Sequence, residues 1–154
     1  MRERLRVLPP EVLLEEYREL LKHEEIEALP LVISGNSMSP FLIHGRDTVY
    51  LSRPKRPVKK GDVLLYQRAN GAYILHRVYK VEGDVYTMVG DAQEVLEPGI
   101  RRDQVIAIMT SAERKGKRQA PGCFWWEFFE KIWIRLIPLR RVVRGGYTAI
   151  KRLI

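Results

Sequence analysis

Residues 62–89 read DVLLYQRANGAYILHRVYKVEGDVYTMV and contain three runs rich in β-branched, aromatic and aliphatic residues. Asn70-Gly71 separates the first two runs, and Gly83-Asp84 separates the second from the third. Glycine and asparagine tolerate the positive backbone angles of tight turns, and Asn-Gly favours a type I′ hairpin. The stretch therefore predicts two successive antiparallel hairpins, with His76 in their central strand.

Similar short runs flank this stretch, namely LPLVIS at 29–34, DTVYLS at 47–52 and QVIAIM at 104–109. They are typical of further strands. The segment RPKRPVKK at 53–60 combines two prolines with five cations, which favours a solvated connection. Behind Pro9-Pro10, leucines and a tyrosine at helical spacing predict a short amphipathic helix. The expected fold class is mainly β (α+β), an antiparallel β fold with a short N-terminal helix.

The 154 residues carry a formal net charge of +8, and the charge is unevenly distributed. Residues 1–110 hold 16 basic and 16 acidic residues, whereas 111–154 hold 11 basic and 3 acidic ones. The length suits one compact domain with an appendage. We expect an N-terminal helical segment at 1–30, a β domain at 31–110 and a basic C-terminal part at 111–154.

Cys123 is the single cysteine, so no internal disulfide can form and an oxidising compartment is not indicated. The N-terminal residues lack the apolar core of a secretion signal and the long uncharged run of a spanning helix. We therefore expect the protein to be cytoplasmic, either free or peripheral on the inner face of the membrane.

Residues 34–47 read SGNSMSPFLIHGRD. Ser37 follows Gly35-Asn36 and precedes Pro40, so small residues let another backbone approach closely and the proline stiffens the exit. On chemistry alone Ser37 is an ordinary loop serine. However, this Ser-Met-x-Pro box resembles the nucleophile box of type I signal peptidases and, more distantly, of LexA-like self-cleaving repressors.

Further segments resemble the same serine-peptidase superfamily in the same order, and the resemblance covers residues 31–109. They are Lys60–Val63, Leu75–Val78, Gly90–Ala92 and Gln104–Met109. Bacterial signal peptidases and LexA-like proteins have a lysine base, whereas archaeal and endoplasmic-reticulum signal peptidases have His-Arg-Val, as this chain does at 76–78. The resemblance implies a signal peptidase/LexA-like fold, with Ser37 as nucleophile and His76 as general base.

A serine hydroxyl is a poor nucleophile at neutral pH until a base takes its proton. Histidine is neutral there without burial, whereas lysine is not. His76 alternates with Ile74 and Val78, so spacing alone leaves a satisfied core histidine as the alternative. With an ordinary pKa of about 6.5, a histidine base predicts activity that falls as the pH drops through that value. We expect His23 and His44 to be solvated surface residues.

A third group should orient the imidazole. The resemblance implies an acid six residues beyond Asp91, where this chain has Glu97 in place of the family's aspartate. Asp91 is the alternative acid, although an aspartate in a tight turn also caps backbone donors. Asp103 is a third choice and is expected to set a turn. By analogy, the N–H groups of Asn36 and Ser37 are the candidate oxyanion donors.

Two positions depart from the family pattern. Gly35 stands where some members carry a hydroxyl, so backbone donors must bind more of the oxyanion. Arg46 separates Gly45 from Asp47, a pair that is adjacent in the family. No metal or organic cofactor is implied.

The C-terminal part starts with SAERKGKRQAPG at 111–122, which predicts a basic linker. Residues 123–144 then read CFWWEFFEKIWIRLIPLRRVVR and predict an amphipathic helix that bends at Pro138. At about 100° per residue, one side holds Glu127, Glu130, Lys131, Ile134 and Arg141. We expect this helix to contact an anionic membrane surface, with packing on the sheet as the alternative.

The expected function is that of a serine endopeptidase of the signal-peptidase type, which cleaves a leader or membrane-proximal peptide. Charged residues interrupt the C-terminal segment too often for a spanning helix. No nucleic-acid-reading module is recognisable, so no nucleic-acid partner is expected. Two alternatives are a self-cleaving LexA-like peptidase and a catalytically silent β-scaffold that serves as a membrane-associated interaction module.

Overall fold

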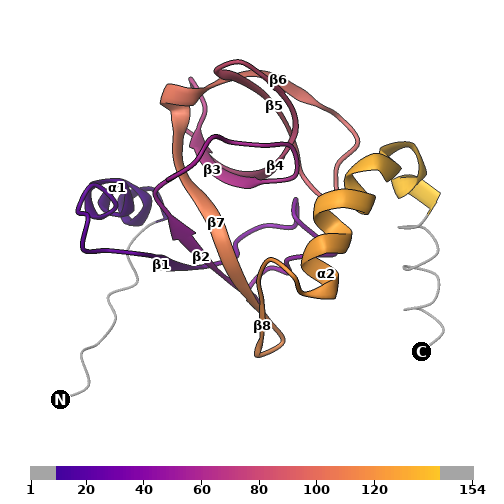
Figure 1. Ribbon diagram of the computed structural model, residues 1–154, viewed down its shortest axis with the longest axis horizontal. Coiled ribbons are helices and arrows are strands. Elements are labelled where there is room, and N and C mark those ends of the chain that lie inside the picture. Colours follow the sequence, from indigo (N-terminus) through magenta and orange to yellow (C-terminus); the bar gives the residue numbers. More distant parts are fainter. Residues whose placement is uncertain (1–9, 143–154) are drawn as a thin grey trace.

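The computed structural model describes residues 10–142, so the parts of the expected segments at 1–9 and 143–154 lie outside the described residues. Within the described part, eight strands form one antiparallel sheet in the order β1-β2-β7-β3-β4-β5-β6, with β8 paired to β7. Helix α1 lies at one side of this sheet and a C-terminal helical segment at the other (Figure 1). The expectation of a mainly β fold with a helix at each end is confirmed.

The bounds of the elements follow the chain. They are α1 Pro10–Leu20, β1 Leu29–Val32, β2 Thr48–Ser52, β3 Val63–Gln67, β4 Tyr73–Glu82, β5 Val85–Val89, β6 Glu97–Arg101, β7 Val105–Arg114 and β8 Lys117–Gln119. A 3₁₀ turn, η1, covers Arg102–Gln104 and contains Asp103. The C-terminal segment consists of α2 Phe124–Glu127, η2 Phe128–Ile132 and η3 Trp133–Leu139.

The two predicted hairpins are present as β3-β4 and β4-β5. Gly83-Asp84 forms the second turn, as expected. In the first, Gly71 has a φ of 90° but Asn70 has no positive φ, so the connection is not the predicted type I′ turn. Arg68 and Ala72 close a longer loop instead, through a 2.8 Å bond from the N–H of Arg68.

Residues 111–119 form strand and hairpin rather than the predicted linker. Strand β7 continues through Arg114 and pairs with β8. Lys115 and Gly116 make the turn with φ values of 50° and 74°, as a two-residue I′ turn requires. Ala112 is fully buried, which anchors this extension in the core. The basic composition concealed the pattern, because Lys115, Lys117 and Arg118 are exposed and the partly buried Arg114 is a cation as well.

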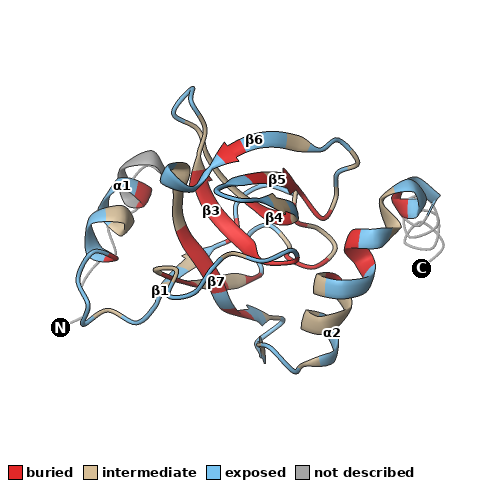
Figure 2. Cartoon of the chain, turned by 45° about the horizontal axis from the view of Figure 1, so that its top comes forward, coloured by how far each residue is buried: buried red, intermediate tan, exposed pale blue. Residues whose placement is uncertain are grey.

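Two apolar clusters lie on the two faces of the sheet. The smaller one contains Leu64, Tyr66, Val78, Tyr86, Met88, Ile100 and Ile108. The larger one joins residues from α1, the loop before β2, the strands and the C-terminal segment, among them Leu14, Phe41, Val49 and Phe129. Figure 2 shows the buried residues concentrated in the central strands β3, β5 and β7.

The C-terminal helical segment packs on the sheet with one face. Phe129, Trp133 and Ile134 are buried, and the phenyl rings of Phe129 and Phe41 lie 4.8 Å apart. Backbone angles leave the helical range at Leu136, shortly before Pro138, in agreement with the expected bend. Among residues 10–142, no helix has both the length and the apolar character needed to cross a bilayer.

The five residues expected on one side of this segment do not share one environment, because Lys131 and Arg141 are exposed. Ile134 is buried, and Glu130 forms an ion pair with Lys59 on the side that faces the sheet. Phe124 and Trp125, by contrast, are exposed. The segment is apolar on two sides, so its periodicity could not tell which apolar side packs.

Candidate active site

Ser37 lies in the turn-rich loop between β1 and β2. Met38, Phe41 and Leu42 of this loop are buried in the larger apolar cluster. Ser37 itself is half-buried, and Asn36 is exposed. The apolar residues thus fix the loop while its polar N-terminal part stays at the surface.

Polar contacts hold both ends of the loop. His44 is exposed, as expected, and its Nδ1 also accepts from the N–H of Gly35 over 2.8 Å, which supports the loop. Asp47 is fully buried and accepts from the N–H of Ile43 at 2.9 Å and from Nε of Arg46 at 2.7 Å. Arg46 therefore binds the aspartate that directly follows it in the sequence.

The carbonyl of Ser37 is bound by the turn after β5. It accepts from the N–H of Ala92 over 2.9 Å. A Cβ placed on Gly90 would lie only 2.5 Å from the same carbonyl oxygen, so only glycine allows this approach. The Gly-Asp-Ala segment that the sequence singled out is therefore the contact surface for the serine loop.

The same turn continues a strand that pairs beside His76. Arg77 on β4 is opposite Val89, the last residue of β5. The turn that binds the Ser37 carbonyl thus starts directly after the strand partner of the residue that follows His76. Within residues 10–142, no hydrogen bond joins their side chains, although such bonds are often long in the absence of substrate.

His76 is a buried imidazole with one polar neighbour. Its Nδ1 lies 3.4 Å from the hydroxyl oxygen of Tyr66, which is fully buried in the smaller cluster. Burial lowers the pKa of His76 to about 4, against the opposing effect of the Glu97 carboxylate. The ring is therefore neutral at physiological pH, as a general base must be.

Glu97 belongs to the same group of side chains but contacts Tyr66 rather than His76. The hydroxyl of Tyr66 donates to Oε1 of Glu97, and Oε2 of Glu97 lies 2.7 Å from Nε of Arg68. Burial and the carboxylate together raise the pKa of Tyr66. The hydroxyl proton consequently stays on Tyr66, directed at Glu97.

Asp91 is fully buried and has a different partner. Both of its carboxylate oxygens accept from Arg77, from Nε and Nη2 at 2.8 Å each. Its carbonyl oxygen accepts from Nε1 of Trp133, also at 2.8 Å. Asp91 thus connects β4, the turn after β5 and the C-terminal segment. Glu97, by contrast, contacts Tyr66, the residue next to His76. Asp103 lies in η1, as a turn residue should.

The candidate oxyanion donors are free of internal partners. Among the described residues, none accepts a hydrogen bond from the backbone N–H of Asn36 or Ser37. Both groups are therefore available to a bound carbonyl oxygen.

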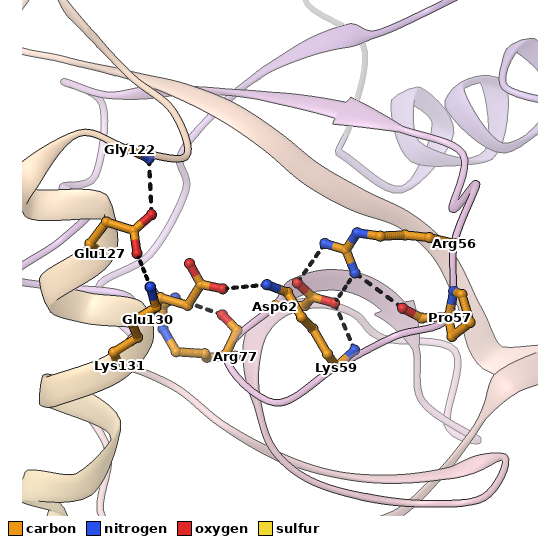
Figure 3. A network of polar contacts seen from close by, with 10 residues as sticks. Arg56, Pro57, Lys59, Asp62, Arg77, Gly122, Glu127, Glu130 and Lys131 are labelled. Carbon is orange, nitrogen blue, oxygen red and sulfur yellow. Dashed lines mark hydrogen bonds and ion pairs between the residues drawn. The ribbon is translucent and has the colours of Figure 1, made fainter.

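The C-terminal segment holds this site at two places. At the first, Lys59 lies 3.0 Å from Oε1 of Glu130, and a Cβ on Gly61 would come within 2.6 Å of the Glu130 side chain. Arg56 binds the Asp62 carboxylate in the same network (Figure 3). At the second, the buried Arg140 donates to the carbonyls of Gly90, Gln93 and Trp133 at 2.7–3.1 Å.

Sequence reasoning missed Tyr66, Arg68 and Arg140. A signal for Tyr66 exists, because Leu64 pairs with His76 in the observed register and Tyr66, two residues on, must project from the same face. No comparable local signal marks Arg140, whose partners come from distant parts of the chain.

Comparison of the chain with known protein families, with curated proteins and with solved structures finds no match.

Proposed function

We propose that this protein is a serine endopeptidase of the signal-peptidase type, in which Ser37 attacks the peptide carbonyl and His76 takes the hydroxyl proton. The observation that carries the proposal is the turn after β5. Its Ala92 N–H binds the Ser37 carbonyl at 2.9 Å, and it follows Val89, which pairs with Arg77, the residue after His76. The turn thus links the serine loop to the strand pair that carries His76.

The contacts of Tyr66 assign the tautomer of His76. Because the Tyr66 hydroxyl donates to Glu97, its oxygen faces the imidazole as an acceptor. Nδ1 of His76 therefore carries the hydrogen, and Nε2 keeps the lone pair that a base requires. Glu97 orients the imidazole indirectly, through Tyr66. In Ser-His-Asp enzymes the carboxylate contacts the imidazole directly.

The reaction follows from these assignments. As Oγ of Ser37 bonds to the substrate carbonyl carbon, its proton moves to Nε2 of His76, and the N–H groups of Asn36 and Ser37 bind the oxyanion. Protonated His76 then gives its proton to the leaving amine, the C–N bond breaks and an acyl ester remains on Ser37. Water, deprotonated by His76, hydrolyses the ester and restores serine and neutral histidine.

The proposed substrate is a leader or membrane-proximal peptide at the cytoplasmic face of a membrane, with self-cleavage as a variant of the same chemistry. A fluorescent fluorophosphonate tests the nucleophile, because it reacts with activated serines and leaves a stable adduct. We expect labelling of the wild type and its loss in both Ser37→Ala and His76→Ala. Ser39→Ala, in the same loop, and His23→Ala, in the exposed turn after α1, should label like the wild type.

Intact-mass and peptide mapping should place one adduct on Ser37. Equal labelling of Ser37→Ala and the wild type would refute the proposed nucleophile, and undiminished labelling of folded His76→Ala would refute the proposed base. A folded wild type that never labels would favour the rival function, a silent β-scaffold that acts as an interaction module.

A further inference from the structure

The outer face of the C-terminal helical segment is apolar although nothing in residues 10–142 covers it. Phe124 is 71% exposed and Ile132 51% exposed, and Trp125 is exposed beside them. The rings of Phe124, Trp125 and Phe128 contact one another with centroids 5.0–6.3 Å apart. Phe124, Trp125 and Ile132 form an exposed apolar ridge, and the half-buried Phe128 joins this ridge to the larger core cluster.

The opposite face of the same segment is engaged with the protein. Phe129 and Trp133 are buried, and Glu130 is paired with Lys59. The exposed ridge is therefore a second apolar face, distinct from the face that packs on the sheet. Burying these side chains against a further apolar phase is favourable by about 25 cal/mol per Å² of apolar surface.

Cations border the ridge. Arg135 is exposed on the same side of the helix as the ridge, and the exposed Lys131 lies beside it, paired with Glu127. The turn of the β7-β8 hairpin adds Lys115, Lys117 and Arg118, and this hairpin lies next to the ridge because the Arg114 guanidinium is 5.8 Å from the Trp125 ring. Aromatic rings with flanking lysines and arginines complement the headgroup region of an anionic membrane.

We propose that this ridge docks the protein onto an anionic membrane surface, with the helical segment parallel to the bilayer. The segment enters the interface with Phe124, Trp125 and Ile132. On its inner side, Trp133 and Arg140 bind the turn whose Ala92 N–H contacts the Ser37 carbonyl. Docking thus brings the active site to peptides at the membrane surface. This inference extends the proposed peptidase function, but the ridge itself does not depend on catalysis.

Vesicle flotation tests the docking surface with the full chain. We expect the protein to float with phosphatidylcholine vesicles that contain phosphatidylserine, to float less with phosphatidylcholine alone, and to dissociate as salt is raised. Phe124→Ser/Ile132→Ser should weaken binding about tenfold or more, since both side chains lose their apolar insertion. Val32→Ser is the matched control, because Val32 is 58% exposed but belongs to β1, at the end of the strand order.

Circular dichroism and thermal melting should show that the double variant is folded. Binding that is equal for the double variant and the wild type, or an absence of wild-type flotation, would overturn the proposal. A dimer in sedimentation velocity that the double variant abolishes, without vesicle binding, would instead assign the ridge to a second copy of the chain. Ser37→Ala should float like the wild type, which separates failure of docking from failure of the peptidase proposal.

Discussion

At the scale of single residues, the balance around His76 decides what the site can do. Desolvation outweighs the attraction of Glu97 and keeps the imidazole neutral. A histidine in water would be partly protonated just below neutrality. The buried ring therefore stays neutral over a wider acidic range than the sequence-based expectation assumed.

The first prediction concerns this pH range. Nuclear magnetic resonance titration of the His76 ring should give a pKa near 4, well below the 6.5 of a solvated histidine. Only the neutral ring accepts the serine proton, so the rate of phosphonate labelling should not change as the pH drops through 6.5. The rate should fall when the pH drops through about 4. A labelling rate that halves near 6.5 in the folded protein would contradict the burial argument.

The second prediction concerns Tyr66. Tyr66→Phe removes the acceptor for Nδ1 of His76 but keeps the ring in the apolar cluster. The tautomer is then no longer fixed, and we expect labelling to slow by about tenfold to a hundredfold. The pH at half-maximal rate should also move, which a purely structural role would not produce. Tyr86→Phe, in the same cluster, is the control and should leave the labelling rate unchanged.

At the scale of elements, the turn after β5 is the decisive piece of backbone. It contacts the serine loop through Gly90 and Ala92, and the C-terminal segment through the carbonyls of Gly90, Asp91 and Gln93. An element that is bound on both sides can transmit a small displacement from one side to the other.

The third prediction is a steric test of that turn. Gly90→Ala places a Cβ 2.5 Å from the Ser37 carbonyl, so the serine loop must shift and labelling should be lost, with about 1–3 kcal/mol of destabilisation. Gly83→Ala is the control, because its new Cβ meets nothing within 4 Å but its φ is +60°. It should cost about 1 kcal/mol through backbone strain and leave labelling of the folded protein intact.

The fourth prediction compares two neighbouring arginines. Arg140 has no exposed surface and three carbonyl acceptors, so Arg140→Met should destabilise the protein by about 3 kcal/mol and slow labelling. The Arg141 side chain is 85% exposed beside Glu94, and Arg141→Met should change the free energy of unfolding by less than about 0.5 kcal/mol. Urea denaturation of both variants measures the difference. Equal free energies of unfolding would show that the hydrogen bonds from Arg140 to the turn after β5 do not stabilise the protein.

At the scale of the whole molecule, three stretches of the chain share one core. Leu14 and Leu21 at the N-terminal end, the strands, and Phe129 and Trp133 near the other end belong to the same buried cluster. Among the described residues, apolar contacts thus join the sheet to the C-terminal segment. The two parts should therefore depend on each other for stability.

The fifth prediction tests this dependence. Tryptophan fluorescence reports on the C-terminal segment, which contains Trp125, Trp126 and Trp133, whereas the far-ultraviolet circular dichroism is dominated by the sheet. We expect the two signals to follow one urea transition with the same midpoint. A fluorescence transition at clearly lower urea would show that the segment detaches before the sheet unfolds.

The sequence by itself determined the strands with clear period-two patterns, both hairpin positions in the 62–89 stretch, and the N-terminal helix. These features are local, since burial of alternate side chains and turn chemistry act over a few residues. The same reasoning missed β6, whose EPGIR segment has no apolar alternation, and β8, whose residues are basic.

The candidate site shows the same division. Ser37, His76 and Glu97 were selected from motif order, but only the fold shows that Tyr66 stands between the acid and the imidazole and that Asp91 belongs to Arg77. Tertiary structure also decided which apolar side of the C-terminal helix is buried. Such partners are set by packing between segments that are distant in sequence. A hydrophobic pattern along the chain does not specify which of two apolar helix faces packs on the sheet.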